Sequence, residues 1–429
     1  TGMAASLSSD VNDPAARSVE FMDLVHAFEE QAKGLIKGGV DFLLVETVFD
    51  LLNAKAAVFG INSARKELNS ETPFVLSITV SETSGRILSG HTIEAFVTAM
   101  SSFNPLAMGI NCSAGPDKLA PFLRELTAVS PFLVIFYPNA GHPDELGNYA
   151  QTPEIFSSEI KKLLDEGLLN IVGGCCGTTP EHIHLISAFA KDAEPRHVSL
   201  GESGRTEWLA ALDVFHDDRG FINVGERCNV AGSRKFLRLI KEKSYDEALS
   251  IARRQVADGA MILDLNFDDG LLDAQVEMVH FLRLLSSDPE TASVPWMIDS
   301  SDFNVIEAAL QNVPGKAIVN SISLKHGEEE FMEQARIIAS YGAAVVVMLF
   351  DEIGQATDYE RKIQIAARAY RILTEKCGYS PEDIIIDPNV LSIATGMSEH
   401  DAYALDFIKA VRWIKDNLPG AKTSGGISN

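Results

Sequence analysis

Three cysteines stand where a metal ion could be bound. Cys175 and Cys176 are adjacent in the sequence GGCCG, and Cys112 ends an apolar stretch much earlier in the chain. Glycines beside the pair leave the backbone room to turn both thiolates toward one ion. A catalytic zinc site typically has three protein ligands and one open position, and thiolate is a preferred soft ligand. Buried cysteine can also serve simply as a small apolar side chain, which is the better interpretation of Cys228 and Cys377.

A second group of polar residues follows the apolar stretches in the second half of the chain. Carboxylate and amide groups on one rim can pair with a ring that offers both donors and acceptors, as a pterin does. A single acid after a strand could instead cap the next helix, but repetition on successive strands favours a binding site. The residues are Asn229, Asp264, Asn266, Asp299, Asn320, Asp387, Asn389 and Asn429.

Both groups depend on strands that bring their ends together. In the first half, an amphipathic pattern from Phe21 to Ile36 predicts a helix that ends at Gly38. Near-continuous apolar runs then alternate with helical patterns, which predicts a parallel sheet covered on both faces. In a parallel β/α barrel the active site is built at the C-terminal ends of the strands. The predicted strands are residues 42–47, 74–80, 106–113, 132–141 and 169–177.

The same alternation restarts after a charged, turn-rich stretch. We expect an α/β protein of two consecutive (β/α)8 TIM-type barrels, the first lacking its N-terminal strands and the second its last strand. The expected domains are residues 1–195 and 222–429, with 196–221 as a linker. The chain starts on Thr1 and stops on Asn429 directly after a strand, so we expect a fragment. The strands of the second half are predicted at 222–229, 261–269, 294–301, 317–323, 343–352, 384–389 and 422–429.

Composition limits the classes of function. A chain of 429 residues with 46% hydrophobic residues can bury two sizeable cores. The 36 Lys and Arg against 60 Asp and Glu give a net charge of −24, which disfavours nucleic acid and anionic membranes as partners. Five cysteines are too few for a disulfide scaffold. No apolar run approaches the roughly 20 residues of a membrane-spanning helix, so we expect a soluble cytoplasmic protein.

Four motifs of the first half occur in a characteristic order: ETVFD (46–50), GINCS (109–113), YPNAG (137–141) and GGCCGT (173–178). Together they resemble the zinc-dependent homocysteine methyltransferase family, over residues 1 to about 190. The resemblance implies that Cys112, Cys175 and Cys176 bind Zn²⁺ and that Glu46 binds the amino group of homocysteine. A free thiol has a pKa of about 8.5, whereas a coordinating thiol is deprotonated. Zinc would therefore present homocysteine as a thiolate nucleophile.

The second half contains VGERCN, DLNFDDG, MIDSS, IVNSIS, IIDPN and TSGGISN. These motifs resemble the pterin-binding methyltransferase family, which includes folate domains of methionine synthases, and more distantly dihydropteroate synthase. The resemblance implies that Asp299, Asn320 and Asp387 hold the pterin ring of 5-methyltetrahydrofolate. Asn429 would lie near N5 as the catalytic residue. The methyl group leaves a tertiary amine, so hydrogen-bond donation at N5 must strengthen in the transition state.

The order of the two domains resembles the cobalamin-dependent methionine synthases. It implies methyl transfer from 5-methyltetrahydrofolate through cobalamin to zinc-activated homocysteine, giving methionine and tetrahydrofolate. The sequence contains no Asp-x-His-x-x-Gly stretch, so a separate C-terminal domain is expected to be the cobalamin-binding partner. Two alternatives remain. One is a truncated protein that binds folate without turnover, and the other is a dihydropteroate-synthase-like pterin enzyme, for which the first half would have no role.

Overall fold

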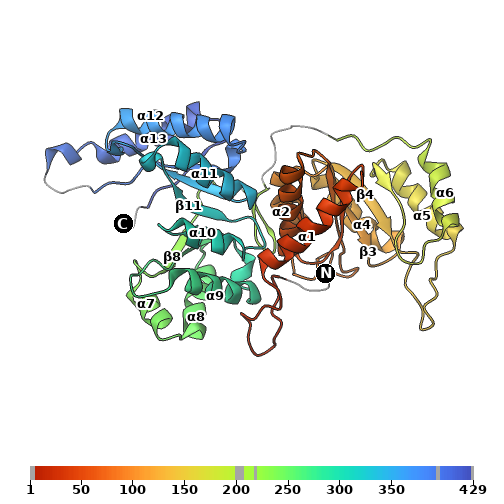
Figure 1. Cartoon of the computed structure of the whole chain (residues 1–429). Coiled ribbons are helices and arrows are strands. Elements are labelled where there is room, and N and C mark those ends of the chain that lie inside the picture. Colours follow the sequence, from red (N-terminus) through yellow and green to blue (C-terminus); the bar gives the residue numbers. More distant parts are fainter. Residues whose placement is uncertain (1–4, 199–206, 217–219, 393–396, 427–429) are drawn as a thin grey trace. The chain divides into compact units, whose positions relative to one another are not determined.

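The chain forms two α/β units. A computed structural model describes residues 5–198, 207–216, 220–392 and 397–426 (Figure 1). The chain divides into the compact units Thr1–Asp218 and Arg219–Asn429, and the division falls within the segment 196–221. Each unit contains one parallel sheet with helices between successive strands. The predicted α/β class is confirmed, and the two parallel sheets are consistent with two barrel domains.

The first unit contains a five-stranded sheet in which the strands follow chain order and every neighbouring pair is parallel. All five predicted strands are present. They are β1 (Leu43–Val48), β2 (Phe74–Ile78), β3 (Ala107–Cys112), β4 (Leu133–Pro138) and β5 (Ile171–Val172). The helices are α1 (Phe21–Lys37), α2 (Leu51–Leu68), α3 (Ile93–Met100), α4 (Pro116–Val129), α5 (Pro153–Asp165) and α6 (Pro180–Ala190).

The main core of this unit lies between the sheet and its helices. The opposite face of the sheet carries a smaller apolar cluster of Val75, Ala107, Ile135 and Tyr137, and Cys175 packs against it. Parallel strands that are buried on both faces read as continuous apolar runs, which is why their positions were predictable. Cys175 therefore has apolar support on this face of the sheet.

Helix α3 explains why part of the expected linker is ordered. A helix that is apolar on all sides must be covered on all sides, and every residue of α3 except Glu94 is buried. An antiparallel hairpin of β6 (Glu207–Ala210) and β7 (Val214–His216) packs against it. The Thr92 amide donates to the Leu212 carbonyl at 2.9 Å, and Arg86 pairs with Asp213 at 2.6 Å. Residues 207–216 are thus part of the first unit.

The second unit contains a seven-stranded parallel sheet in the order β16-β15-β12-β11-β10-β9-β8. Its strands are β8 (Val224–Asn229), β9 (Ile262–Asn266), β10 (Trp296–Asp299), β11 (Ile318–Ile322), β12 (Ala344–Met348), β15 (Ile384–Asp387) and β16 (Lys422–Thr423). The short strands β13 (Phe350–Asp351) and β14 (Gly354–Gln355) form a separate antiparallel pair. All seven predicted strands are present.

The helices of the second unit connect these strands and include one pair, α7 and α8, between β8 and β9. They are α7 (Arg234–Lys241), α8 (Tyr245–Ala257), α9 (Ala274–Ser287), α10 (Phe303–Leu310), α11 (Glu328–Ser340), α12 (Tyr359–Arg371) and α13 (Tyr403–Asn417). Among the described residues of the whole chain, no helix has the length and apolar character needed to span a membrane.

Candidate metal and pterin sites

The three cysteines lie together at the C-terminal ends of β3 and β5. The Sγ atom of Cys176 is 3.9 Å from that of Cys112 and 3.9 Å from that of Cys175. All three sulfur atoms lie within 4.8 Å of one another. Tetrahedral zinc with Zn–S bonds of about 2.3 Å holds its sulfur ligands about 3.8 Å apart. Two of the three sulfur pairs therefore have the spacing of a zinc site, and the third is within 4.8 Å. Cys176 is exposed.

The electrostatics of this cluster also favour a bound cation. Burial and the neighbouring thiols of Cys112 and Cys176 raise the pKa of Cys175 to about 12. Several thiolates this close together repel one another, so they ionise together only if a positive charge offsets the cost. A coordinated metal ion does so, because it deprotonates the thiols that bind it.

The backbone is unusual where the site is built. Thr47, Cys112 and Ser113 have positive φ angles of 56°, 62° and 66°. Such angles are uncommon outside glycine, and for a β-branched residue such as threonine they are outliers. Backbone of this kind gathers at functional sites, where surrounding contacts hold it in place. Here the Ser113 hydroxyl donates to the Val80 carbonyl at 2.5 Å, which fixes the turn after β3.

Asn111 joins three strand ends beneath the cysteines. Its side chain is fully buried. Its Oδ1 accepts hydrogen bonds from the Thr47 amide at 3.0 Å and the Ser77 hydroxyl at 2.8 Å. Its Nδ2 donates to Thr47 Oγ1 at 2.8 Å and lies 4.0 Å from Cys175 Sγ. Sequence reasoning missed this residue, although an amide directly before a candidate ligand was an available signal.

The YPNAG motif fixes the Cys-Cys pair from the side of β4. The Asn139 Oδ1 accepts from the Cys176 amide at 3.1 Å, and the Ala140 amide donates to the Cys176 carbonyl at 2.9 Å. The Cys175 amide donates to the Pro138 carbonyl at 2.8 Å. Backbone bonds on both cysteines therefore define the directions of their side chains.

Glu46, the predicted amine-binding residue, is exposed near the end of β1. Cys175 packs against the apolar cluster that contains Tyr137, and Glu46 is near enough to act on the Tyr137 phenol. Burial raises the pKa of Tyr137 above its usual range, and the charges of Glu46 and Cys175 add to that effect. The structure thus brings the carboxylate and the thiols to the same region, around one tyrosine.

In the second unit, polar residues line up across the sheet edge. Asn229 pairs in register with Asn266, Asn266 with Asp299, and Asp299 with Asn320. Asp387 ends β15, two strands beyond Asn320. The Asn229 Nδ2 donates to Asp299 Oδ2 at 3.4 Å. Because the strands are parallel and in register, these residues share one edge of the sheet.

Burial raises the pKa values of the acids at this edge. Burial, with the carboxylates of Asp299 and Glu226, raises the pKa of Asp264 well above its usual range. Burial also raises the pKa of Asp299 to about 6, with help from Asp268 and Glu226 and against a hydrogen bond from Asn266. Burial raises the pKa of Asp387 as well. Carboxylates accept hydrogen bonds and the neighbouring amides also donate them, which suits the mixed edge of a pterin ring.

These acids do not serve as helix caps. Helices α9, α10 and α12 begin at other aspartates, since Asp273, Asp302 and Asp358 accept from their first-turn amides. Asp268 has a different structural role, because it accepts hydrogen bonds from both Ser300 and Ser301. The capping explanation of the strand-end acids therefore does not apply to Asp264, Asp299 or Asp387.

Comparisons with known proteins agree with this division of the chain. Residues 1–190 match the homocysteine S-methyltransferase family, and residues 225–429 match the pterin binding enzyme family. The chain carries a homocysteine S-methyltransferase domain followed by a pterin-binding domain. This is the architecture of the homocysteine- and folate-binding parts of methionine synthase.

Similar solved structures include Yersinia pestis DHPS with a pterine-sulfa conjugate, at 17% sequence identity and a TM-score of 0.32, covering 48% of this chain and 71% of that one. Plasmodium falciparum HPPK-DHPS, wild type, shows 11% identity and a TM-score of 0.30, over 56% of this chain and 51% of that chain. A triple mutant of the same protein shows 12% identity and a TM-score of 0.30, over 58% and 53%.

The pterin-binding domain anchors the turn after β15 with a lysine that sequence reasoning missed. Lys362 on α12 is fully buried, and its ammonium group donates to the carbonyl oxygens of Ala356, Pro388 and Asn389. The Asn389 amide in turn donates to Asp387 Oδ1 at 2.8 Å. The sequence holds no signal for this role, because the lysine lies in an ordinary amphipathic helix pattern. Asn429, the predicted catalytic residue, lies outside the described residues.

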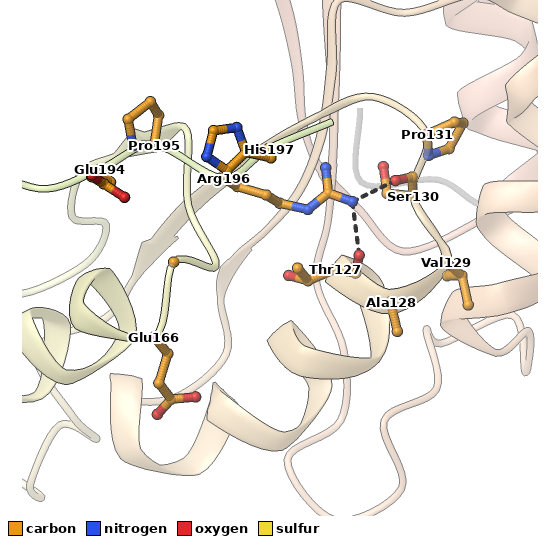
Figure 2. A pocket seen from close by; sticks show the side chains of 11 residues that line it. Thr127, Ala128, Val129, Ser130, Pro131, Glu166, Glu194, Pro195, Arg196 and His197 are labelled. Atoms are coloured by element: carbon orange, nitrogen blue, oxygen red, sulfur yellow. Dashed lines mark hydrogen bonds between the residues drawn. The ribbon is translucent and has the colours of Figure 1, made fainter. Parts of the chain in front are cut away.

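The homocysteine S-methyltransferase domain also has a cavity of about 580 Å³ away from the cysteines. It is lined by residues 127–131 and 166–167, which lead into β4 and β5, so it lies at the opposite end of these strands. Figure 2 shows Arg196 reaching from the chain after α6 toward Thr127 and Ser130. Its guanidinium donates to their carbonyl oxygens at 2.8 and 2.7 Å, which satisfies free carbonyls at the end of α4. We assign this region a structural role.

Proposed function

We propose that this chain activates both substrates of methyl transfer from 5-methyltetrahydrofolate through cobalamin to homocysteine, giving methionine and tetrahydrofolate. This is the reaction of cobalamin-dependent methionine synthases. One observation carries the proposal: a homocysteine S-methyltransferase domain with three thiols at the spacing of zinc ligands is followed by a pterin-binding domain.

In the first domain, Cys112, Cys175 and Cys176 would hold zinc and leave one position for the sulfur of homocysteine. When bound, zinc lowers the pKa of a coordinating thiol so that it is a thiolate at neutral pH. Glu46 would pair with the substrate ammonium group. Asn111 supports this arrangement, because it holds Thr47, next to Glu46, and lies beside Cys175.

In the second domain, Asp299, Asn320 and Asp387 would bind the pterin ring of the folate. The carboxylates of Asp299 and Asp387 would accept from ring N–H groups, and the amide of Asn320 would donate to ring nitrogens. Asn429 would donate to N5, where a positioned donor can be worth about 3 kcal/mol in the transition state.

Cobalamin is the proposed methyl carrier because the two substrates would bind to different domains. Direct displacement requires the sulfur and the methyl carbon to approach within roughly 3 to 3.5 Å. A cobalamin-binding domain would be the partner that visits both sites. We also propose a cytoplasmic location, where the five free cysteines would stay reduced.

The decisive experiment compares zinc binding by the parent protein, Cys176→Ala and the control Cys377→Ala, which changes a cysteine of the other unit. We expect about one zinc ion per chain in the parent and the control, and its loss from Cys176→Ala, measured by metal analysis. In titration calorimetry, the parent and Cys377→Ala should bind homocysteine when zinc is present, and Cys176→Ala should not. Full zinc content in Cys176→Ala, or methionine formation from both substrates with no corrinoid present, would contradict the proposal.

A further inference from the structure

Tyr149 lies against the three-cysteine cluster from the loop between β4 and α5. Gly177 directly follows Cys176, and a Cβ atom at Gly177 would lie 2.1 Å from Cγ of the Tyr149 ring and 2.5 Å from both Cδ atoms. The ring therefore rests on the backbone of the Gly-rich turn. Besides its burial, the thiols of Cys176, Cys112 and Cys175 raise the pKa of the Tyr149 phenol, so the hydroxyl is near the cluster.

The loop that carries Tyr149 is closed on itself. Asp144 Oδ1 accepts hydrogen bonds from the amides of Leu146 at 2.9 Å and Asn148 at 2.8 Å. Pro143 and Tyr149 then pair in an antiparallel bridge at the base of this turn. Side-chain-to-backbone bonds of this kind stabilise a turn, so the ring is presented to the cysteines by a defined structure.

Gly177 is suited to this contact for two reasons. Its φ angle of 79° is in the left-handed region that glycine adopts without strain. It also has no Cβ, which leaves the space that the Tyr149 ring fills. The glycine after the Cys-Cys pair therefore allows both the turn of the backbone and the close approach of the tyrosine.

We propose that Tyr149 is a positioning residue of the metal site, whose phenol donates a hydrogen bond to the Cys176 sulfur when that sulfur is a metal-bound thiolate. This inference rests on the zinc site of the proposed function. Asn111 Nδ2 lies 4.0 Å from the sulfur of Cys175. With metal bound, Tyr149 would give a second of the three sulfur atoms a protein donor. Groups that donate to metal ligands fix their orientation and tune the metal.

The charge balance explains the benefit to homocysteine. Three thiolates on one Zn²⁺ ion leave a net charge of −1, and a fourth thiolate raises it to −2. A hydrogen bond to a charged acceptor is stronger than one between neutral groups, so the phenol would disperse part of this charge. Tyr149 would therefore favour the binding of zinc by the three cysteines. It would also favour the later binding of the substrate thiolate.

The test uses the full chain and compares Tyr149→Phe with the parent, with Tyr149→Ala and with Leu146→Ala. The phenylalanine variant keeps the ring and loses only the hydroxyl. Leu146 is 87% exposed at the tip of the same loop, so its variant controls for loop changes. Zinc affinity is measured by competition with a chelator, and Co²⁺ replaces zinc for absorption spectroscopy.

We expect Tyr149→Phe to bind zinc about 10-fold to 100-fold more weakly than the parent. Its thiolate-to-cobalt charge-transfer band should move to lower energy, because the Cys176 sulfur has lost a donor. Leu146→Ala should match the parent in zinc affinity and in the energy of the charge-transfer band. Parent-like affinity and spectrum in Tyr149→Phe, with weaker binding only in Tyr149→Ala, would overturn the proposal and leave the ring a packing role. Absence of zinc binding in the parent itself would instead overturn the proposed function, and this inference with it.

Discussion

Replacing Asp299 with asparagine should stabilise the pterin-binding domain without ligand and weaken its binding of folate. Asp299 is half-buried, and burial with the nearby carboxylates of Asp268 and Glu226 raises its pKa from 3.8 to about 6. At neutral pH the folded domain therefore keeps this group ionised in surroundings that disfavour charge. Asparagine has nearly the same shape and no charge, so it removes this cost and also removes a charged partner of the folate.

The size of the gain follows from the difference between the two pKa values. One pKa unit corresponds to about 1.36 kcal/mol, so a rise from 3.8 to about 6 corresponds to roughly 3 kcal/mol. Partial exposure and electrostatic coupling to Asp264 reduce the value that a single substitution recovers. We expect Asp299→Asn to raise the free energy of unfolding by about 1 to 2 kcal/mol at pH 7.5.

The pH dependence gives this prediction its sign. Because its pKa is raised on folding, Asp299 binds a proton more tightly in the folded state than in the unfolded state. The stability of the parent therefore falls as pH rises from about 4 to about 6, and it gains nothing further from this group above that window. Asp299→Asn lacks this dependence, so its advantage should be small near pH 4 and complete above pH 6.

The assay measures unfolding of the pterin-binding domain in the full chain, by calorimetry and in urea, between pH 4.5 and 7.5. Asp258→Asn is the control. Asp258 is exposed at the end of α8, where its ion pair with Arg254 contributes little. Titration with 5-methyltetrahydrofolate should show about tenfold to hundredfold weaker binding by Asp299→Asn. A variant less stable than the parent at pH 7.5, or a gain of equal size at pH 4.5 and 7.5, would refute the reasoning.

Two further substitutions test the other supports of the sites. In a titration, Asp387→Ala should bind 5-methyltetrahydrofolate about tenfold to hundredfold more weakly than the parent, since it loses a charge-assisted hydrogen bond. The control Asp416→Ala, on the exposed face of α13, should bind normally. Equal affinities of the two variants would count against Asp387. Arg196→Ala should lower the unfolding free energy of the first unit by about 2 to 3 kcal/mol, because it leaves carbonyls at the end of α4 without their charged donor. The zinc content of Arg196→Ala should equal that of the parent. The control Arg254→Ala, at an exposed position, should lower the unfolding free energy by less than about 0.5 kcal/mol. Unchanged stability of Arg196→Ala would contradict the anchor role.

The sequence determined the elements well because burial leaves a periodic pattern. The first helix was predicted from Phe21 to Ile36 and runs from Phe21 to Lys37. Central parallel strands such as β2, β3 and β12 are buried, so each appears as an apolar run. The predicted five and seven strands became the two sheets. The hairpin of residues 207–216 was not predicted, because the sequence around it is charged and rich in turn residues. Its apolar residues are buried only because they pack against α3, a contact that local sequence does not reveal.

The sequence also identified the residues that could do chemistry, because cysteines, acids and amides at strand ends are unusual in a buried sheet. The assignment of zinc and folate to them remains a prediction. Lys362 and Asn111 were not predicted, because the sequence does not show whether a lysine or an asparagine is buried. Their roles become visible only from the carbonyl and hydroxyl groups around them.

Only the tertiary structure decided the geometry of the sites. Cys112 and Cys176 are 64 residues apart in the chain, and their sulfur atoms are 3.9 Å apart in space. That distance arises because β3 and β5 flank β4 in one parallel sheet, and because a left-handed turn at Cys112 ends β3 there. Likewise, the register between neighbouring strands sets Asn266, Asp299 and Asn320 side by side. Sheet order, register and turn geometry depend on contacts between residues far apart in the chain, which local sequence patterns do not encode.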